Sequence, residues 1–505
     1  MQKSKVIGKN PKSRKWILAA LMFTTMLAAM DNTIVSTAIP QIVGDLGGFS
    51  LFSWVFSIYL LTQTITIPVY GKLADIYGRK PILIIGTSIF LLGSATSAIS
   101  WNMISLIIFR GLQGLGAGSI MASVNTIAGD IYSIEERANI EGWLSSVWGM
   151  AAIMGPTIGG ALAEYANWRW IFLINLPIGI VAIILLLSYF KENIKKSKHS
   201  IDFFGAILML LSGTALIFTL MQVGQEWGWD STPGLLMIVL TVLLITSTIY
   251  VERKSIEPIM PKWIWTNKTL IGANLSIVCM GAIMIGPNMY LPVFSQSVLQ
   301  LGAIESGLIL ASMSIGWPLA SSLSGKLYLH IGFRNTAILG SIIIAIASSL
   351  FIFLPYNTSV WLMVIDQMCI GAGFGLLSTP MLVGVQSIVP WSKRGVVTGA
   401  NMFSRYLGQS LGAAILGGIF NLSMNSQLHT ADKNLLGKLP TNINNVISTL
   451  RDNTTLPNIE IFLRHSFYLS THKVYIAMTI IGILALLFLM LLPKKLATNN
   501  DSNEH

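Results

Sequence analysis

The chain has 505 residues, of which 53% are hydrophobic and only 10% charged, and its mean hydropathy is +0.68. Soluble globular proteins carry about 25% charged residues, so this composition excludes an ordinary soluble domain and predicts a membrane protein. In a soluble chain the net charge of +11 would suggest nucleic-acid binding, but here we attribute it to loops that face anionic lipid. We therefore expect membrane lipid, and no nucleic acid, among the partners.

Fourteen long apolar stretches follow one another along the chain. Each predicts a membrane-spanning helix, because a backbone in lipid must satisfy its own hydrogen bonds. The predicted spans are 16–39, 51–70, 82–100, 102–127, 140–163, 169–190, 203–222, 233–252, 268–290, 304–324, 336–355, 360–383, 396–420 and 474–493. The sequence thus predicts an all-α polytopic protein.

Lysine and arginine gather on one side of the predicted membrane. The segment before the first span and every second connection hold 24 of the 32 Lys and Arg residues, whereas the alternate short connections hold only Arg169. Cytoplasmic loops retain positive charge, so we expect these segments and both termini to be cytoplasmic. The long polar loop 421–472 then lies outside the cell.

Two pairs of segments repeat along the chain. GKLADIYGRK at 71–80 resembles GKLYLHIGFR at 325–334, and RGLQGLGAG at 110–118 resembles IDQMCIGAG at 365–373. The two offsets, 254 and 255 residues, agree closely and indicate two homologous halves. Parallel six-span repeats are a transporter architecture in which the substrate binds between the halves.

The repeat predicts three parts. Residues 1–190 form a six-span bundle, residues 191–267 form a linker with two inserted spans, and residues 268–505 form the second six-span bundle. The most basic internal linker, at 191–200, separates the first six spans from the rest.

Two charged residues inside the first bundle are the sharpest chemical signal. Asp31 lies about eight residues from the outer end of span 1, roughly 12 Å deep at 1.5 Å per residue. Arg110 lies at a similar depth in span 4. A lone carboxylate there costs several kcal/mol, so we expect Asp31 to be paired, protonated or hydrated. It is either a protonation switch, with Arg110 tuning its pKa or relaying the proton, or half of a static ion pair.

Three other residues are predicted to face the substrate cavity, together with Asp31: Gln113, Trp148 and Asp366. Asp366 lies about six residues below the outer end of span 12, where it would attract a positively charged ligand or take a second proton. The alternative is a wetted acid at the outer rim. Glu141, at the predicted cytoplasmic start of span 5, is expected to serve topology or helix capping.

Five segments together resemble the 14-span drug:proton antiporters of the major facilitator superfamily, the quaternary-ammonium and multidrug efflux type. They are MDNTIVSTAIP at 30–40, GKLADIYGRKP at 71–81, RGLQGLGAGS at 110–119, GPTIGG at 155–160 and WRWIFLINLPIG at 168–179. The resemblance covers all fourteen predicted spans in order. The chain departs from it at Ala151, where the exporter motif often has glycine, and at Leu329, which replaces the acid in the repeated loop.

The resemblance implies roles for two further groups of residues. A cytoplasmic gate loop would clasp the halves when the cavity faces out; its residues are Gly71, Asp75, Gly78, Arg79 and Lys80. An exporter motif would seal and bend at the interface of the halves; its residues are Gly155, Pro156, Gly159 and Gly160. The alternatives are a basic turn that serves topology alone and ordinary tight helix packing.

The resemblance implies a proton-coupled exporter of lipophilic, cationic drugs that acts as a monomer in the bacterial cytoplasmic membrane. The sequence has no GxxxxGK[ST] phosphate loop and no clustered metal ligands, so we expect a proton gradient as the driving force, no ATP site, no metal, no cofactor and no enzymatic activity. Two alternatives stay open: export of a narrow endogenous cargo such as a metabolite, lipid or peptide antibiotic, and a non-transporting membrane sensor.

Overall fold

The computed structural model describes residues 11–37, 52–192, 203–223, 230–255, 261–301, 303–356, 358–429 and 457–493, with isolated residues between them. These residues are almost entirely helical. Among them, eleven helices are long and apolar enough to cross a membrane, so the chain is a multi-pass all-α membrane protein. Fourteen crossings and the orientation of the termini remain predictions.

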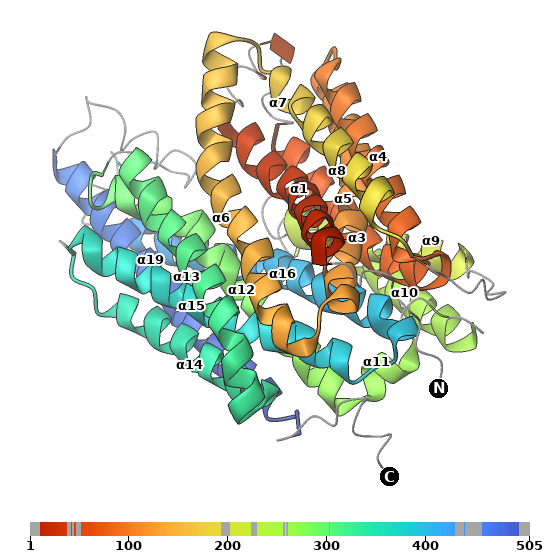
Figure 1. The fold of residues 1–505 in the computed structure, drawn as a ribbon. Helices are drawn as coiled ribbons and strands as arrows, with labels where there is room; N and C mark the ends of the chain where they lie inside the picture. Colours follow the sequence, from red (N-terminus) through yellow and green to blue (C-terminus); the bar gives the residue numbers. More distant parts are fainter. Residues whose placement is uncertain are drawn as a thin grey trace.

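The first bundle contains the helices from residue 11 to residue 189 (Figure 1). They are α1 (Pro11–Thr37), α3 (Phe52–Tyr77), α4 (Arg79–Ala98), α5 (Met103–Ile131), α6 (Ile134–Tyr165), α7 (Trp170–Leu173) and α8 (Asn175–Tyr189). Helices α3 and α6 are not among the eleven helices that are apolar enough to cross a membrane. They nevertheless pack within the bundle, α3 along α5 and α6 along α1.

The second bundle contains α12 (Lys268–Ser297), α13 (Ala303–Ile331), α14 (Phe333–Ile352), α15 (Val360–Ser387), α16 (Arg394–His429) and α19 (Pro457–Leu489). Helices α16 and α19 are longer than predicted and take in both ends of the expected loop 421–472. The reason is that Leu463 and Phe467, in the predicted loop, are buried in the core of the second bundle.

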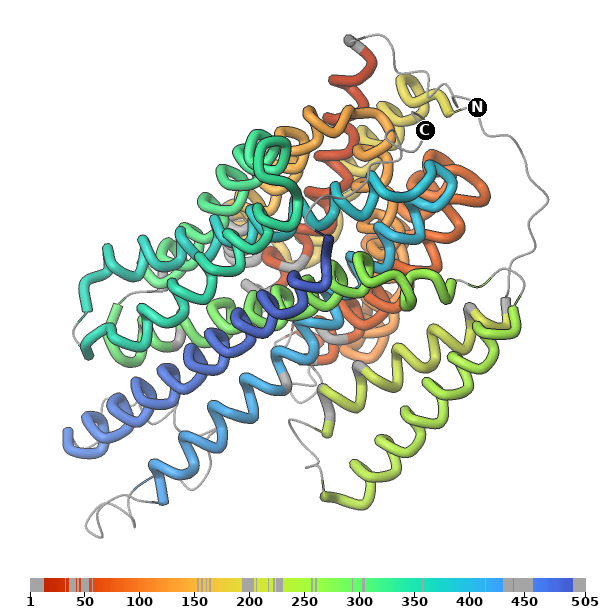
Figure 2. Tube along the Cα trace, turned by 90° about the horizontal axis from the view of Figure 1, so that it is seen from below, coloured from red at the N-terminus to blue at the C-terminus, as the bar shows by residue number. Residues whose placement is uncertain are grey.

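Helices α9 (Phe203–Gln222) and α10 (Thr232–Lys254) form a separate pair, and the short α11 (Lys262–Thr266) follows them. Figure 2 shows the pair running side by side at the edge of the molecule. Thr219 and Thr241 share a hydrogen bond of 2.8 Å between the two helices, and α9 also touches α3 and α16. The outer face of α10 exposes large apolar residues such as Leu236 and Leu243, as expected of a helix that faces lipid.

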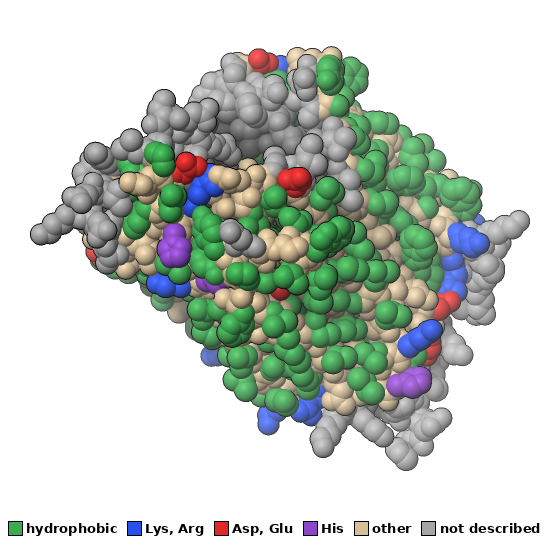
Figure 3. Space-filling model, turned by 90° about the vertical axis from the view of Figure 1, so that its left-hand side faces the viewer, with side chains coloured by type: hydrophobic (Ala, Val, Ile, Leu, Met, Phe, Trp, Pro, Cys, Tyr) green, Lys and Arg blue, Asp and Glu red, His purple; other side chains and the backbone are tan. Residues whose placement is uncertain are grey.

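The repeat has a matching backbone in the two bundles. Gly78, between α3 and α4, has φ 100°, and Gly332, between α13 and α14, has φ 87°. Only glycine adopts this conformation without strain. Figure 3 shows that apolar side chains cover much of the visible face, while Lys, Arg, Asp and Glu lie toward its margins. This distribution fits a molecule whose sides are in contact with lipid.

Candidate functional site

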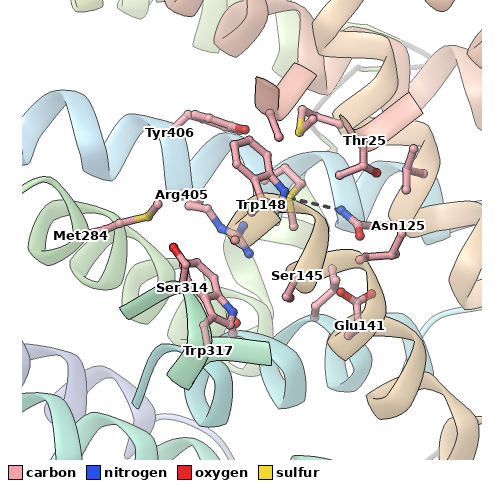
Figure 4. A pocket seen from close by; sticks show the side chains of 18 of the residues that line it. Thr25, Asn125, Glu141, Ser145, Trp148, Met284, Ser314, Trp317, Arg405 and Tyr406 are labelled. Carbon is pink, nitrogen blue, oxygen red and sulfur yellow. Dashed lines mark hydrogen bonds between the residues drawn. The ribbon is translucent and has the colours of Figure 1, made fainter. Parts of the chain in front are cut away.

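A cavity of about 250 Å³ lies between the two bundles (Figure 4). Helices α1, α3, α5 and α6 line it from the first bundle, and α12, α13, α15 and α16 line it from the second. Each wall therefore belongs to one bundle, and the cavity lies at the interface of the two repeats, where transporters of this architecture bind substrate.

The cavity lining is mainly apolar, with aromatic and methionine side chains and a few polar groups. Trp148, Trp317 and Tyr406 supply the aromatic surface, while Asn125 and Gln409 supply amides. Flexible and aromatic side chains of this kind can repack around different lipophilic ligands.

Glu141 and Arg405 are the charged residues among those that line the cavity. The expected capping role of Glu141 is wrong, because α6 begins at Ile134 and Glu141 lies two turns into it; a topological role stays a prediction. The predicted apolar stretch began too late, since the first turns of α6 are polar. Glu141 is an acidic residue seven positions into a helix that faces the interior. This position was the signal in the sequence for a place at the cavity.

The four residues predicted for the cavity separate in the structure. Trp148 lines it, whereas Asp31, Gln113 and Asp366 are not among the lining residues. Asp366 is only 8% exposed and lies inside the second bundle rather than at a wetted rim. Its Oδ2 accepts a hydrogen bond of 2.8 Å from Gln367, which also reaches the Tyr475 hydroxyl of α19. Its Oδ1 has no hydrogen-bond partner in the described part of the chain.

Asp31 forms the centre of a buried polar network in the first bundle. Its Oδ2 pairs with the guanidinium of Arg110, and both side chains are fully buried. Its Oδ1 accepts hydrogen bonds from Gln113 at 2.8 Å and from Asn175 at 3.4 Å. The predicted depths of Asp31 and Arg110 allowed this contact, whereas Asn175, which lies in the segment 168–179, was not singled out as a partner of Asp31.

The remaining contacts of Arg110 fix its position beside Asp31. Its Nη1 donates to Gln113 Oε1 at 2.7 Å, its Nε donates to the Val55 carbonyl at 3.2 Å, and its guanidinium lies 4.3 Å from the centre of the Tyr59 ring. A buried ion pair is costly to form and more costly to break by removing one partner. The network therefore keeps a pair of opposite charges inside the first bundle.

Helix α1 connects this network to the cavity. Thr25, Ala29 and Thr33 line the cavity, and they are spaced four residues apart on one face of α1. Asp31 lies on another face of the same helix, toward α5. The cavity wall and the buried network therefore share one helix.

At one end of the molecule the predicted gate loop joins the bundles; we call this contact the latch. Asp75 at the end of α3 accepts hydrogen bonds from the backbone N–H groups of Gly395 (3.0 Å) and Val396 (2.9 Å), in the first turn of α16. A carboxylate is favourable at a helix N-terminus. Burial nevertheless raises the pKa of Asp75 to about 7, against the opposing effect of Arg79.

Arg79 continues the latch. It donates to Asp75 Oδ1 at 2.7 Å and to the Trp391 carbonyl at 2.8 Å, and its guanidinium lies 3.6 Å from the centre of the Trp391 ring. Asp130, at the end of α5, pairs with Arg79 at 3.1 Å and with Arg394 at 3.0 Å. Asp130, Trp391 and Arg394 were missed in the sequence because each is a single charged or aromatic residue near a helix end.

The two glycines and the lysine of the gate loop have different surroundings. A Cβ on Gly71 would lie 2.6 Å from the Gly395 carbonyl oxygen, so glycine lets α3 and α16 touch. Gly78 makes the turn described above. The Lys80 side chain lies on the first bundle, where its Nζ donates to the Leu187 carbonyl at 3.1 Å and its backbone N–H donates to Glu192 at 2.9 Å.

The exporter motif lies within the first bundle. A Cβ on Gly155 would lie 2.0 Å from Thr33 Oγ1 of α1, and the Thr33 hydroxyl donates to the Ala151 carbonyl at 2.9 Å. Gly159 is also buried, while the side-chain surroundings of Pro156 and Gly160 lie outside what the structure describes. The α6 glycines that meet the second bundle are Gly142 and Gly149, which pack against Ser322 and Ser314 of α13.

Two helical bundles with a repeated turn, joined around a central cavity, define a membrane transporter. The family model of the Major Facilitator Superfamily matches residues 21–413, and the chain belongs to this family. The chain is therefore a transporter by family and fold.

Curated relatives agree with this assignment. Multidrug transporter protein MdtP of Bacillus subtilis (strain 168) is 35% identical over 414 residues, 82% of this chain and 76% of that protein. Multidrug resistance protein 3 of the same strain is 32% identical, covering 84% of this chain and 83% of that protein. Efflux pump FUS6 of Gibberella moniliformis is 31% identical, covering 83% and 76%.

Solved structures share the fold. The human organic anion transporter MFSD10 superposes with a TM-score of 0.65 at 12% identity, over 95% of this chain and all of that one. A bacterial homologue of the iron transporter ferroportin, in an outward-facing state, superposes with a TM-score of 0.58 at 13% identity, over 93% and 99%. At these identities the likeness concerns the fold alone.

Proposed function

We propose that the chain is a secondary active exporter that moves lipophilic drugs across the bacterial cytoplasmic membrane in exchange for protons. The observation that carries this proposal is the fully buried Asp31–Arg110–Gln113 network, placed on α1 directly behind the cavity wall. Relatives that are 31–35% identical are named as multidrug transporters and efflux pumps, and these names support the direction and the cargo.

In the proposed cycle, Asp31 takes a proton from outside the cell while the latch is closed on the cytoplasmic side. Protonation removes the charge that holds Arg110, α1 shifts, and the cavity releases the drug outward. The bundles then rock, the latch opens, and the proton leaves as new drug binds. A membrane potential of ~100 mV supplies about 2.3 kcal/mol for each charge moved.

The cavity supports a substrate with a positive charge, since Glu141 offers a carboxylate at its wall. Asp31 is less suited to direct contact with the drug, because Arg110, Gln113 and Asn175 already occupy its oxygens. We propose that Asp31 handles the proton, that the cavity handles the drug, and that a single chain suffices without ATP or another cofactor.

The experiment that tests this function is ethidium efflux from energised cells that lack other pumps, with a protonophore added midway. Efflux that stops on addition of the protonophore supports proton-coupled drug export. Efflux that continues would contradict proton coupling. No ethidium movement, with the protein verified in the membrane, would favour a narrow cargo instead of a broad cationic one.

The first prediction concerns Asp31→Asn, which resembles the protonated acid. We expect it to abolish ethidium extrusion against a gradient while the protein still reaches the membrane, because a side chain that cannot release a proton cannot couple the cycle. Asp366→Asn is the control buried acid and distinguishes a coupling role from a general need for membrane carboxylates. Active extrusion by the Asp31 variant would show that another residue couples the proton.

A further inference from the structure

The cavity carries one charge of each sign on walls that belong to different bundles. Glu141 stands on α6 of the first bundle, and Arg405 stands on α16 of the second. In Figure 4, Arg405 extends from its helix toward the centre of the site, while Glu141 lies on the α6 side near Ser145. A ligand between the bundles can therefore meet both charges at once.

Neither charge is satisfied by a direct ion pair within the described part of the chain. Arg405 Nε is buried and has no hydrogen-bond partner among the residues that the structure describes. Arg405 and Arg137 act on Glu141 electrostatically, and Tyr406 and Glu141 act on Arg405. A guanidinium with unused donors in a buried site is the side chain best suited to bind a carboxylate.

One aromatic ring lies next to Arg405, and another lines the same cavity from the helix that carries Glu141. The Arg405 guanidinium is 5.5 Å from the centre of the Trp317 ring of α13, and Trp148 lies on α6 two turns beyond Glu141. Indole faces favour flat apolar groups and also tolerate cations. The space between the charges is thus suited to an aromatic body.

We propose that the preferred substrate is an aromatic zwitterion, whose ammonium group binds Glu141 and whose carboxylate binds Arg405. This inference rests on the proposed function and names its substrate class. A purely cationic drug would pair with Glu141 but would leave Arg405 buried without an anion, and a purely anionic drug would do the reverse. Only a ligand with both groups compensates the burial of both side chains.

Three dansyl probes on one scaffold test the proposal. Nα-dansyl-lysine carries an ammonium and a carboxylate, dansylcadaverine keeps the ammonium and lacks the carboxylate, and dansyl-norleucine keeps the carboxylate and lacks the ammonium. Binding to the purified full chain in lipid nanodiscs is measured by energy transfer from tryptophan to dansyl. We expect dansyl-lysine to bind about tenfold or more tightly than either single-charge probe, because charge-assisted hydrogen bonds are the strong ones.

Two variants assign the charges. Arg405→Gln should weaken dansyl-lysine and dansyl-norleucine about tenfold and leave dansylcadaverine nearly unchanged; Glu141→Gln should weaken dansyl-lysine and dansylcadaverine and spare dansyl-norleucine. Ser247→Ala, at an exposed position of α10 outside the lining, is the control and should not alter the order of the probes. If Arg405→Gln does not fold, the proposal is tested by the Arg405→Lys variant and by the order in which the unmodified chain binds the three probes.

Equal or tighter binding of dansylcadaverine than of dansyl-lysine would overturn the proposal, and so would an Arg405→Gln variant that weakens all three probes alike. These measurements need no proton gradient. If the order of the probes fails while ethidium efflux remains sensitive to the protonophore, the substrate class is wrong and the export function stands. If the probes bind in the predicted order while ethidium efflux is insensitive to the protonophore, the zwitterion site stands and proton coupling is wrong.

Discussion

At the residue scale, the buried pair of Asp31 and Arg110 is held asymmetrically. Arg110 has three other supports in Gln113, the Val55 carbonyl and the Tyr59 ring, whereas the other partners of Asp31 are the side-chain amides of Gln113 and Asn175. Without Asp31, the Arg110 guanidinium would keep three neutral contacts; without Arg110, the Asp31 carboxylate would keep two amide donors, both on Oδ1.

This asymmetry predicts the order of stability of two variants. Arg110→Leu should destabilise the protein by about 3–5 kcal/mol, because it leaves the Asp31 carboxylate buried without a counter-charge. Asp31→Asn should cost less, since the amide oxygen still accepts from Arg110. Thermal unfolding in detergent measures both, and the double variant should recover part of the loss. Equal losses for the two single variants would contradict the asymmetry.

At the element scale, α3 and α16 touch through backbone atoms. Gly71 and Gly395 meet so closely that a Cβ on Gly395 would lie 2.4 Å from the Gly71 carbonyl oxygen. Small residues on helices permit this approach, and the atoms opposed are backbone atoms, which cannot rotate away. The latch therefore depends on contact between the helices as well as on the charges of Asp75 and Arg79.

We predict that Gly71→Ala opens the latch. The added methyl group must separate α3 from α16, so the distance between spin labels at Tyr77→Cys and Ser392→Cys should lengthen, in a background in which Cys279 and Cys369 are serine. Gly418→Ala is the matched control, because a Cβ there meets nothing within 4 Å. An unchanged distance distribution in the Gly71 variant would show that the latch tolerates the methyl group.

At the scale of the whole molecule, the latch is expected to respond to pH. Burial raises the pKa of Asp75 to about 7 when the latch is closed, whereas a carboxyl group in water titrates near 4. The closed form therefore binds a proton more tightly than an open form in which Asp75 is in water. Lowering the pH from about 8 to about 5.5 should favour the closed form, by up to tenfold per pH unit between the two pKa values.

The same pair of spin labels measures this dependence as the fraction of the short distance at each pH. Asp75→Asn should remove most of it, and a remainder in the same direction is expected from Glu192, whose pKa burial also raises. A closed fraction that rises with pH would contradict the sign of the prediction.

Several parts of this molecule follow from local patterns in the sequence. Apolar length predicts helices because lipid leaves the backbone no other partner, and the repeated GKL segments predict equivalent turns because glycine alone adopts the φ of Gly78 and Gly332 without strain. The depth of Asp31 and of Arg110 follows from counting residues along a helix, and their contact was permitted by equal depth. Each of these features can be predicted from a single segment or from the spacing between two repeated segments.

Other parts depended on which helices become neighbours. The sequence predicted Gln113 and Asp366 at the cavity, yet they face the interiors of their own bundles, and it predicted a capping role for Glu141, which lines the cavity. Rotation of a helix about its axis decides such placements, and an apolar helix in lipid has no strong sequence signal for rotation. The rotation of each helix is determined by its packing against other helices. The same packing places Glu141 and Arg405, 264 positions apart in the sequence, on facing walls of one site.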